Sequence, residues 1–356
     1  MKNAISPKLA AAADLGALIM SGLYTVFYLS YVARHLVEGR ANSLAELYDR
    51  DAAFNSAALA LLVSLVVFVH LARACTRIRT PITPSTEIDP GQAGLAALAV
   101  LALSTIYVSS PSTSYEGLHQ HIGESSLGKL LYVPYIYYSY LLARGIERKP
   151  SLQQATTEFI VLSLGFTLLV PMRSPMLTHA LVLLIIYRPP ARKFLIATVL
   201  IAVAFLAIAI GRGATGAIDQ DQLIDAVGML IFGPSLQIDL YEIAKADGYG
   251  TAKDLYEFLA TRYEEYFDEG GGFGSFITLE VEQYLPGNGL APIVIALVPL
   301  VLRGIGRLTP VTNALVVVAG IQALTILRNP ISSWLNGYIV SLLFYAIFQK
   351  KSQPDH

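Results

Sequence analysis

The sequence has few charged residues and a single cysteine. Of its 356 residues, 14% are charged and 54% are hydrophobic, and the mean hydropathy is +0.55. A soluble domain carries about 25% charged residues, so the composition predicts an integral membrane protein. Because Cys75 is the only cysteine, an intrachain disulfide and a cysteine-based metal cluster are excluded. The net charge of −1 gives no indication of nucleic-acid binding.

Metal-ligand spacing is also missing from the sequence. No His, Asp and Glu residues recur at the intervals of a metal site, and no Asp-x-Asp or Ser-His-Asp pattern stands out. We therefore expect neither a metal nor a cofactor. The apolar run that follows Lys2 and Lys8 is too long for a signal-peptide core, and it is interpreted as a retained first membrane span.

Ten apolar stretches are candidates for transmembrane helices, which need about 20 residues each. They lie near 11–33, 52–72, 92–110, 129–143, 154–171, 174–187, 194–211, 289–305, 310–327 and 331–348. The sequence thus predicts an all-α integral membrane protein in three parts. Residues 1–211 would form a membrane domain of seven spans, 212–288 a large helical loop, and 289–356 the last three spans and a tail.

The distribution of Lys and Arg predicts the orientation of these spans. With both termini in the cytoplasm, the inner connections hold 15 of the 25 Lys and Arg residues, as the positive-inside rule requires. The loop over 212–288 then lies outside. It contains 4 Lys or Arg and 14 Asp or Glu, a formal charge of −10.

The long loop is expected to contain helices. Apolar and acidic residues alternate at helical spacing over 252–267, which predicts an amphipathic helix that covers the membrane domain. A shorter helix is expected over 234–246, with Leu236, Ile238, Leu240 and Ile243 partly buried.

Three arginines are the first candidates for a binding site. Arg173 and Arg188 lie 15 residues apart, a helical rise of about 22 Å against a hydrocarbon core of about 30 Å. Either one of them snorkels, or the bilayer thins, or Arg173 lies in a wet cavity, where an arginine usually marks a site. Arg212 and Arg328 also end outer spans. Together the three guanidinium groups would suit a diphosphate.

Further candidates lie near the end of the long loop. The run Gly-Gly-Gly-Phe-Gly-Ser at 270–275 is either a hinge or a helix start at Ser275 that binds an anion. Glu282 begins Glu-Gln-Tyr-Leu-Pro-Gly and is either a general base or a solvated glutamate. Glu280 would point about 200° away from it on a helix. Arg262 would bind substrate or pair with Glu265.

Polar residues within the spans complete the set. His179, six residues after Arg173, could face the same cavity, although a polar packing role is favoured. Asp14 and Glu158 are interpreted as interhelical hydrogen-bond partners. The fourth span carries five tyrosines, which are either an interfacial belt or the wall of a groove: Tyr132, Tyr135, Tyr137, Tyr138 and Tyr140.

The order of these features over 154–348 resembles the Wzy-type O-antigen polymerases. The resemblance rests on the turn at Arg173, the long outer loop, Gly-Phe-Gly-Ser ending at Ser275, and Arg328 before the last span. The family pattern of a glutamate, an aromatic residue two later and a glycine five later fits Glu282, Tyr284 and Gly287. Pro286 stands where the family more often has an aromatic residue.

The resemblance implies a bacterial inner-membrane glycosyltransferase of GT-C-like architecture. Such an enzyme is inverting and independent of metal, and it works on the periplasmic face. It moves a growing glycan from undecaprenyl diphosphate onto a lipid-linked repeat unit. Arg173 and Arg328 would be catalytic through the diphosphate and Glu282 would be the base, with five residues binding substrate: Arg212, Tyr284, Ser275, His179 and Arg262.

The resemblance also implies a chain-length regulator and a flippase as partners, besides the lipid-linked donor and acceptor and membrane lipid. Two other functions stay open. An O-antigen ligase shares the architecture but transfers glycan to a lipid A core. A flippase or transporter of the same lipid-linked glycan would need ionisable residues through the depth of the membrane.

Overall fold

A computed structural model describes residues 7–38, 49–76, 85–110, 126–164, 174–187, 290–323 and 331–352, together with single positions at 196, 200, 203, 238, 242, 243 and 246. Every regular element in these ranges is helical. The elements are α1 (Pro7–Glu38), α2 (Arg50–Thr76), α3 (Pro90–Ser109), η2 (Ser126–Tyr132), α5 (Val133–Glu147), α6 (Leu152–Glu158), η3 (Phe159–Leu164), α8 (Ser174–Tyr187), α14 (Ala291–Ile305), α15 (Pro310–Ile321) and α17 (Ile331–Ser352).

The helices are those of a membrane protein. In the described part of the chain, three are long and apolar enough to cross a bilayer: Leu9–Val37, Arg50–Cys75 and Pro90–Ser109. Four shorter apolar helices accompany them, at Pro175–Tyr187, Ala291–Ile305, Pro310–Ile321 and Gly337–Lys350. Large apolar side chains of α2 such as Leu62 and Val66 are exposed, as expected for a lipid-facing surface. The all-α class is confirmed for the described residues, and three of their helices have the length and composition of membrane spans.

The observed helices refine several predicted spans. Helix α8 begins and ends at the predicted residues, and its 14 residues span only about 21 Å. The predicted span 129–143 is a 3₁₀-helix that continues into α5. The predicted span over 154–171 begins as α6 and continues as the π-helix η3. The predicted span 194–211 lies outside the described residues except at 196, 200 and 203.

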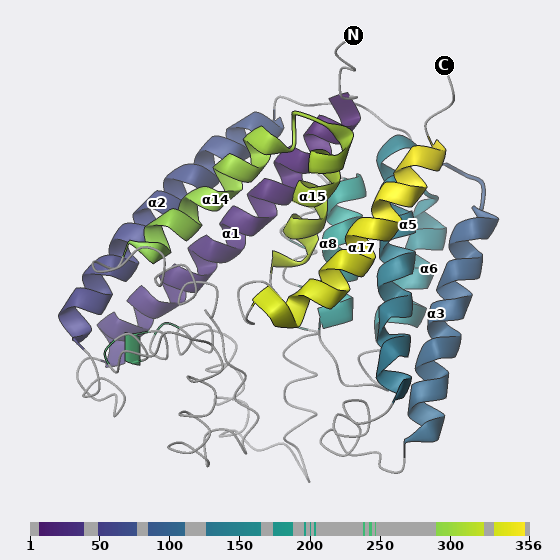
Figure 1. Ribbon diagram of the computed structural model, residues 1–356, viewed down its shortest axis with the longest axis horizontal. Helices are drawn as coiled ribbons and strands as arrows, with labels where there is room; N and C mark the ends of the chain where they lie inside the picture. Colours follow the sequence, from purple (N-terminus) through teal and green to yellow (C-terminus); the bar gives the residue numbers. More distant parts are fainter. Residues whose placement is uncertain are drawn as a thin grey trace.

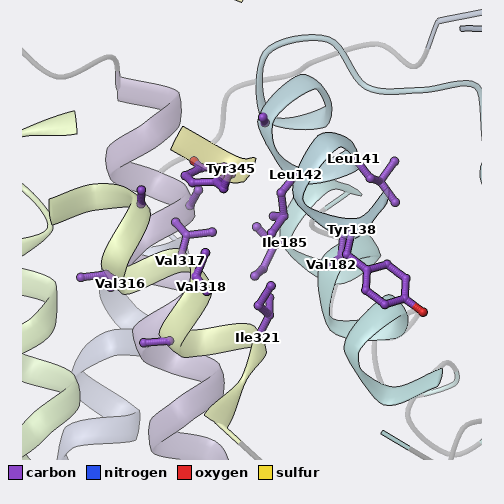
Figure 2. Close-up of a cluster of buried hydrophobic side chains, with 14 of the residues drawn as sticks. Tyr138, Leu141, Leu142, Val182, Ile185, Val316, Val317, Val318, Ile321 and Tyr345 are labelled. Carbon is purple, nitrogen blue, oxygen red and sulfur yellow. The ribbon is translucent and has the colours of Figure 1, made fainter. Parts of the chain in front are cut away.

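The helices form two groups (Figure 1), which meet where α15 contacts α17 and where α1 contacts α5 and α8. Helix α1 packs against α2, α14 and α15, whereas α5 packs against α3, α8 and α17. Helices α15 and α17 contact each other between the groups. Both termini lie at the same edge of the bundle. The main core lies where α15 faces α5 and α8, with the valines of α15 opposite Leu142 and Ile185 (Figure 2).

Connections that the charge pattern places on the inner side lie next to one another. The amide of Ser85 donates to the carbonyl of Lys149 at 2.9 Å, and the Lys149 ammonium donates to the carbonyl of Tyr187 at 3.3 Å. Elsewhere, Asn313 donates to the carbonyls of Leu9 and Gly306. These contacts agree with a shared side for the predicted inner connections.

Local sequence signals mark the first residues of the helices that begin on this side. Asp89 caps α3 ahead of Pro90, and Ser151 caps α6. Thr309 caps α15 ahead of Pro310 and forms a capping box with Thr312. A capping side chain satisfies amides that the first helical turn leaves unpaired, and proline at the first helical position needs no such partner.

The predicted helix over 234–246 is confirmed at the positions that the structure describes. Residues 238, 242, 243 and 246 are helical, and Ile238 and Ile243 are buried. Ile238 packs with Phe27, Tyr28 and Tyr31. These residues belong to the second half of α1, the half farther from the N-terminus.

Helices α1 and α15 approach each other closely at two glycines. A Cβ atom added to Gly320 would lie 2.5 Å from the Cα of Gly16 and 2.7 Å from its carbonyl oxygen. Both obstacles are backbone atoms, which cannot rotate away. Small residues that let two backbones approach are a common device of membrane helix packing.

We therefore predict that Gly320→Ala destabilises the protein by about 1–3 kcal/mol, the usual cost of overpacking. Gly94→Ala is the matched control, because a Cβ atom there would meet nothing within 4 Å. Thermal unfolding of the purified protein in detergent measures both variants. Equal stability of the two would contradict the close approach of α1 and α15.

Candidate functional site

Of the predicted site residues, the structure describes His179. The others lie outside the described residues: Glu282, Arg173, Arg328, Arg212, Tyr284, Ser275 and Arg262. Their roles stay predictions. His179 belongs to a buried network of polar side chains. The network joins α3, α5, α6, η3 and α8.

Glu158 is the centre of this network. Its side chain is buried, and its carboxylate accepts hydrogen bonds from three side chains on three helices. The Tyr137 hydroxyl donates to Oε2 at 2.7 Å, and the Gln92 amide donates to the same oxygen. The Gln154 amide donates to Oε1 at 2.9 Å. An ionised carboxylate inside a membrane bundle needs such partners, and Glu158 has them from α3, α5 and α6.

His179 continues the network from Tyr137. The ring is fully buried; its Nε2 lies 3.4 Å from the Tyr137 hydroxyl, and its Nδ1 lies 2.6 Å from the hydroxyl of Ser163. The Tyr137 hydroxyl uses its one proton in the hydrogen bond to Glu158. The phenol oxygen therefore has its lone pairs free to accept from the ring. His179 thus joins Ser163 of η3 to Tyr137 of α5 and, through Tyr137, to Glu158.

The π-helix explains how Ser163 reaches the ring. Phe159–Leu164 follows Glu158 directly and has π geometry. Single π turns within helices are rare and often occur at functional sites. In this chain, the π turn carries Ser163 and places Phe159 against the imidazole, with ring centroids 5.2 Å apart. The irregular turn and the buried histidine are therefore one structural feature.

The network extends to the end of the bundle that holds the N-cap of α3. Gln154 pairs with the backbone of Asp89, donating to its carbonyl at 3.2 Å and accepting from its amide at 3.0 Å. The Asp89 carboxylate accepts from the Tyr140 hydroxyl at 3.1 Å and from the first amides of α3, including Gln92. A carboxylate, a phenol and an imidazole in contact can bind and pass a proton.

Three consecutive residues of α5 bind three different elements. Tyr137 donates to Glu158 of α6, as described above. The Tyr138 hydroxyl donates to the carbonyl of Pro175 at 3.1 Å. The Ser139 hydroxyl shares its single proton between the carbonyl of Tyr135 on its own helix, at 2.7 Å, and the carbonyl of Ser341 on α17, at 3.0 Å. Helix α5 therefore fixes both α8 and α17.

The tyrosines of the fourth span fit neither sequence-based interpretation in full. Tyr137 and Tyr138 are fully buried and contact the ring of His179. They are core residues, neither an interfacial belt nor the wall of an open groove. Tyr140 lies nearer the end of α5 and bonds to Asp89. The hydroxyls of Tyr137 and Tyr138 donate to acceptors inside the bundle, so these tyrosines contribute polar contacts to the core.

A second buried carboxylate ties the other helix group together. Asp14 of α1 is fully buried and accepts from the Arg303 Nε at 3.0 Å. It also accepts from the Arg307 Nη2, at 2.8 Å to Oδ1 and 2.6 Å to Oδ2. The predicted role of Asp14 and Glu158 as interhelical hydrogen-bond partners is confirmed. Within the described ranges, no three His, Cys, Asp or Glu residues gather as a metal site.

The comparisons with known proteins give no assignment. No family model matches the chain, and no curated protein and no solved structure matches it. The function is therefore argued from the residues alone.

Sequence reasoning found the two carboxylates and the histidine but missed their partners. Gln92, Gln154 and Ser163 were not singled out. One signal was present, because Gln154 and Glu158 are four residues apart and share a helix face. The pairing with Gln92 and Ser163 depends on helix packing and on the π turn, which the sequence pattern does not indicate.

His179 has the polar packing role that the sequence favours. Its ring is enclosed by Tyr137, Tyr138 and Phe159, so its contacts are with protein. A role in binding substrate stays a prediction.

We predict that Glu158→Ala destabilises the bundle by about 1–2 kcal/mol, because the buried donors Gln92 and Tyr137 and the half-buried Gln154 lose their acceptor. Hydrogen bonds between membrane helices average about 0.6 kcal/mol each. Glu87→Ala is the control, since Glu87 pairs with Arg148 at a site where its side chain is 77% exposed. Such a pair contributes less than about 1 kcal/mol. Thermal unfolding in detergent measures the stability of both variants. An equal loss of stability in the two would contradict the central position of Glu158.

Proposed function

We propose that this protein is a membrane glycan polymerase. It would transfer a growing glycan from undecaprenyl diphosphate to a lipid-linked oligosaccharide repeat unit, on the outer face of a bacterial inner membrane, with inversion at the anomeric carbon. The proposal rests on the sequence features from Arg173 to Arg328. It includes ten spans, a GT-C-like architecture and cytoplasmic termini.

One geometric observation supports this proposal. Helices α8 and α17 begin one and three residues after Arg173 and Arg328. Both helices are bonded to α5, through Pro175 and Ser341. Two arginines that are 155 residues apart in sequence therefore precede helices that are both supported by α5.

The proposed chemistry uses the arginines and one carboxylate. The acceptor hydroxyl attacks the anomeric carbon of the donor, and Glu282 takes the hydroxyl proton. The bond between the anomeric carbon and the diphosphate oxygen breaks, and the diphosphate leaves with the electron pair. Arg173 and Arg328 stabilise the charge that develops on it, and bidentate guanidinium contacts suit its geometry. Arg212, Arg262, Ser275 and Tyr284 would hold the substrates.

A transporter of lipid-linked glycan is the second candidate function. It is favoured by the Glu158–Tyr137–His179 network, because ionisable residues at membrane depth often mark an ion or substrate pathway. The three donors on Glu158 equally suit a structural role. A ligase that transfers glycan to a lipid A core shares the proposed arginine chemistry and differs in its acceptor.

We predict that Arg173→Ala and Arg328→Ala each abolish long glycan chains while the protein is still inserted in the membrane. Without either guanidinium group, the leaving diphosphate is less stabilised, and loss of one such donor typically lowers the rate about 100- to 1000-fold. Glycan length ladders on a gel measure the effect. Arg148→Ala is the matched control, because the Arg148 side chain is 71% exposed and lies on the opposite predicted side. Unchanged glycan ladders in both variants would contradict a diphosphate site at Arg173 and Arg328.

We predict that Glu282→Gln lowers polymerisation about 100-fold or more, the usual contribution of a general base. Glu280→Gln should leave the rate unchanged, because residues two apart on a helix point in nearly opposite directions. Initial rates of chain extension at matched protein level compare the two. A normal rate in Glu282→Gln would show that this carboxylate is not the base.

A further inference from the structure

The cluster around Asp14 carries more positive charge than its buried carboxylate neutralises. Asp14 accepts from both Arg303 and Arg307, so two guanidinium groups share one carboxylate and the group has a net charge of +1. The side chain of Arg307 is 43% exposed, whereas that of Arg303 is 18% exposed. The surplus charge therefore faces outward from the bundle at Arg307.

His70 of α2 extends this cluster to the surface. The Arg303 Nη1 lies 3.2 Å from the His70 Nε2. Because a guanidinium group can only donate, Nε2 accepts and the second ring nitrogen carries the proton. His70 is an exposed residue. Among the bonds formed within the described residues, none uses the Nε or Nη1 of Arg307, so these donors remain available to a ligand.

An apolar surface leads along α2 to these donors. Leu62 and Val66 are exposed and share one face of the helix with His70, at successive spacings of four residues. Val69, which is also exposed, lies three residues after Val66. Leu308, next to Arg307, is also exposed. The surface thus combines a lipid-facing stripe with a cationic group at its end, on the side where the charge pattern places the cytoplasm.

We propose that Arg307, Arg303 and His70 bind the phosphate of an anionic phospholipid of the inner leaflet, with its acyl chains along the Leu62–Val66–Val69 stripe. Asp14 fixes both guanidinium groups before the ligand arrives, so the binding costs little side-chain ordering. Arginine donors match the oxygens of a phosphate, and basic groups between helices on the cytoplasmic side bind such headgroups. The site is independent of the glycan chemistry, which would lie on the opposite face.

The test compares lipid binding by wild type and variants in detergent. Native mass spectrometry is used to titrate the purified protein with phosphatidylglycerol and, separately, with phosphatidylcholine. The wild type is expected to prefer phosphatidylglycerol. Arg307→Gln should weaken its binding about fivefold, the typical contribution of one basic residue near a lipid surface. Arg148→Gln, which changes an exposed arginine elsewhere, should bind as the wild type does.

A second variant covers the case in which Arg307→Gln does not fold. His70→Glu changes an exposed residue, leaves both arginines on Asp14, and lowers the net charge of the cluster to zero. It should also lose the preference for phosphatidylglycerol. Equal binding of both lipids by the wild type, or an unchanged preference in His70→Glu, would overturn the proposal.

Inorganic phosphate distinguishes a lipid from a free anion. At millimolar concentration it should not displace phosphatidylglycerol, because it lacks the contacts with the apolar stripe. If phosphate displaces the lipid fully, the site binds a free anion and the assignment to a phospholipid is wrong. Glycan polymerisation is measured separately, so failure here leaves the proposed function untouched.

Discussion

A buried carboxylate in a lipid-facing bundle must receive its hydrogen bonds from protein groups instead of water, and this constraint organises the described structure. Glu158 is held by donors from α3, α5 and α6. Asp14 of α1 is held by Arg303 of α14 and by Arg307 in the turn that follows it. Each helix group therefore has one carboxylate whose charge can be tolerated only when its neighbours are in place. The apolar contacts of α15 with α5 and α8 join the two groups (Figure 2).

Helix α5 connects this architecture to the proposed function. Through Tyr137, Tyr138 and Ser139 it binds the network, the start of α8 and the middle of α17. The same helix therefore supports the two elements that follow Arg173 and Arg328. A polar network behind such a site would keep it rigid, whereas in a transporter the same groups would carry a proton. Helix α5 connects the Glu158 network to α8 and α17. A polymerase and a transporter differ in whether a new glycosidic bond forms on the bound glycan.

The sequence was informative where composition or spacing acts locally. Hydropathy predicted the all-α membrane class, and the bounds of α8 were predicted to the residue because Arg173 and Arg188 enclose a short, largely apolar run. The interhelical role of Asp14 and Glu158 followed from their position within apolar spans. The π turn at Phe159–Leu164 and the partners Gln92 and Ser163 were not predicted, because they depend on how helices distant in sequence pack. The burial of Tyr137 and Tyr138 has the same cause.

The most direct measurement of the central claim is reconstitution of the purified protein in vesicles with purified lipid-linked repeat units and no added metal. The products are separated by length, and movement of the lipid-linked unit across the bilayer is followed in the same vesicles. The account predicts longer glycans that remain attached to undecaprenyl diphosphate, with release of one undecaprenyl diphosphate for each new glycosidic bond. Movement across the bilayer without any new glycosidic bond would contradict it and would identify a transporter.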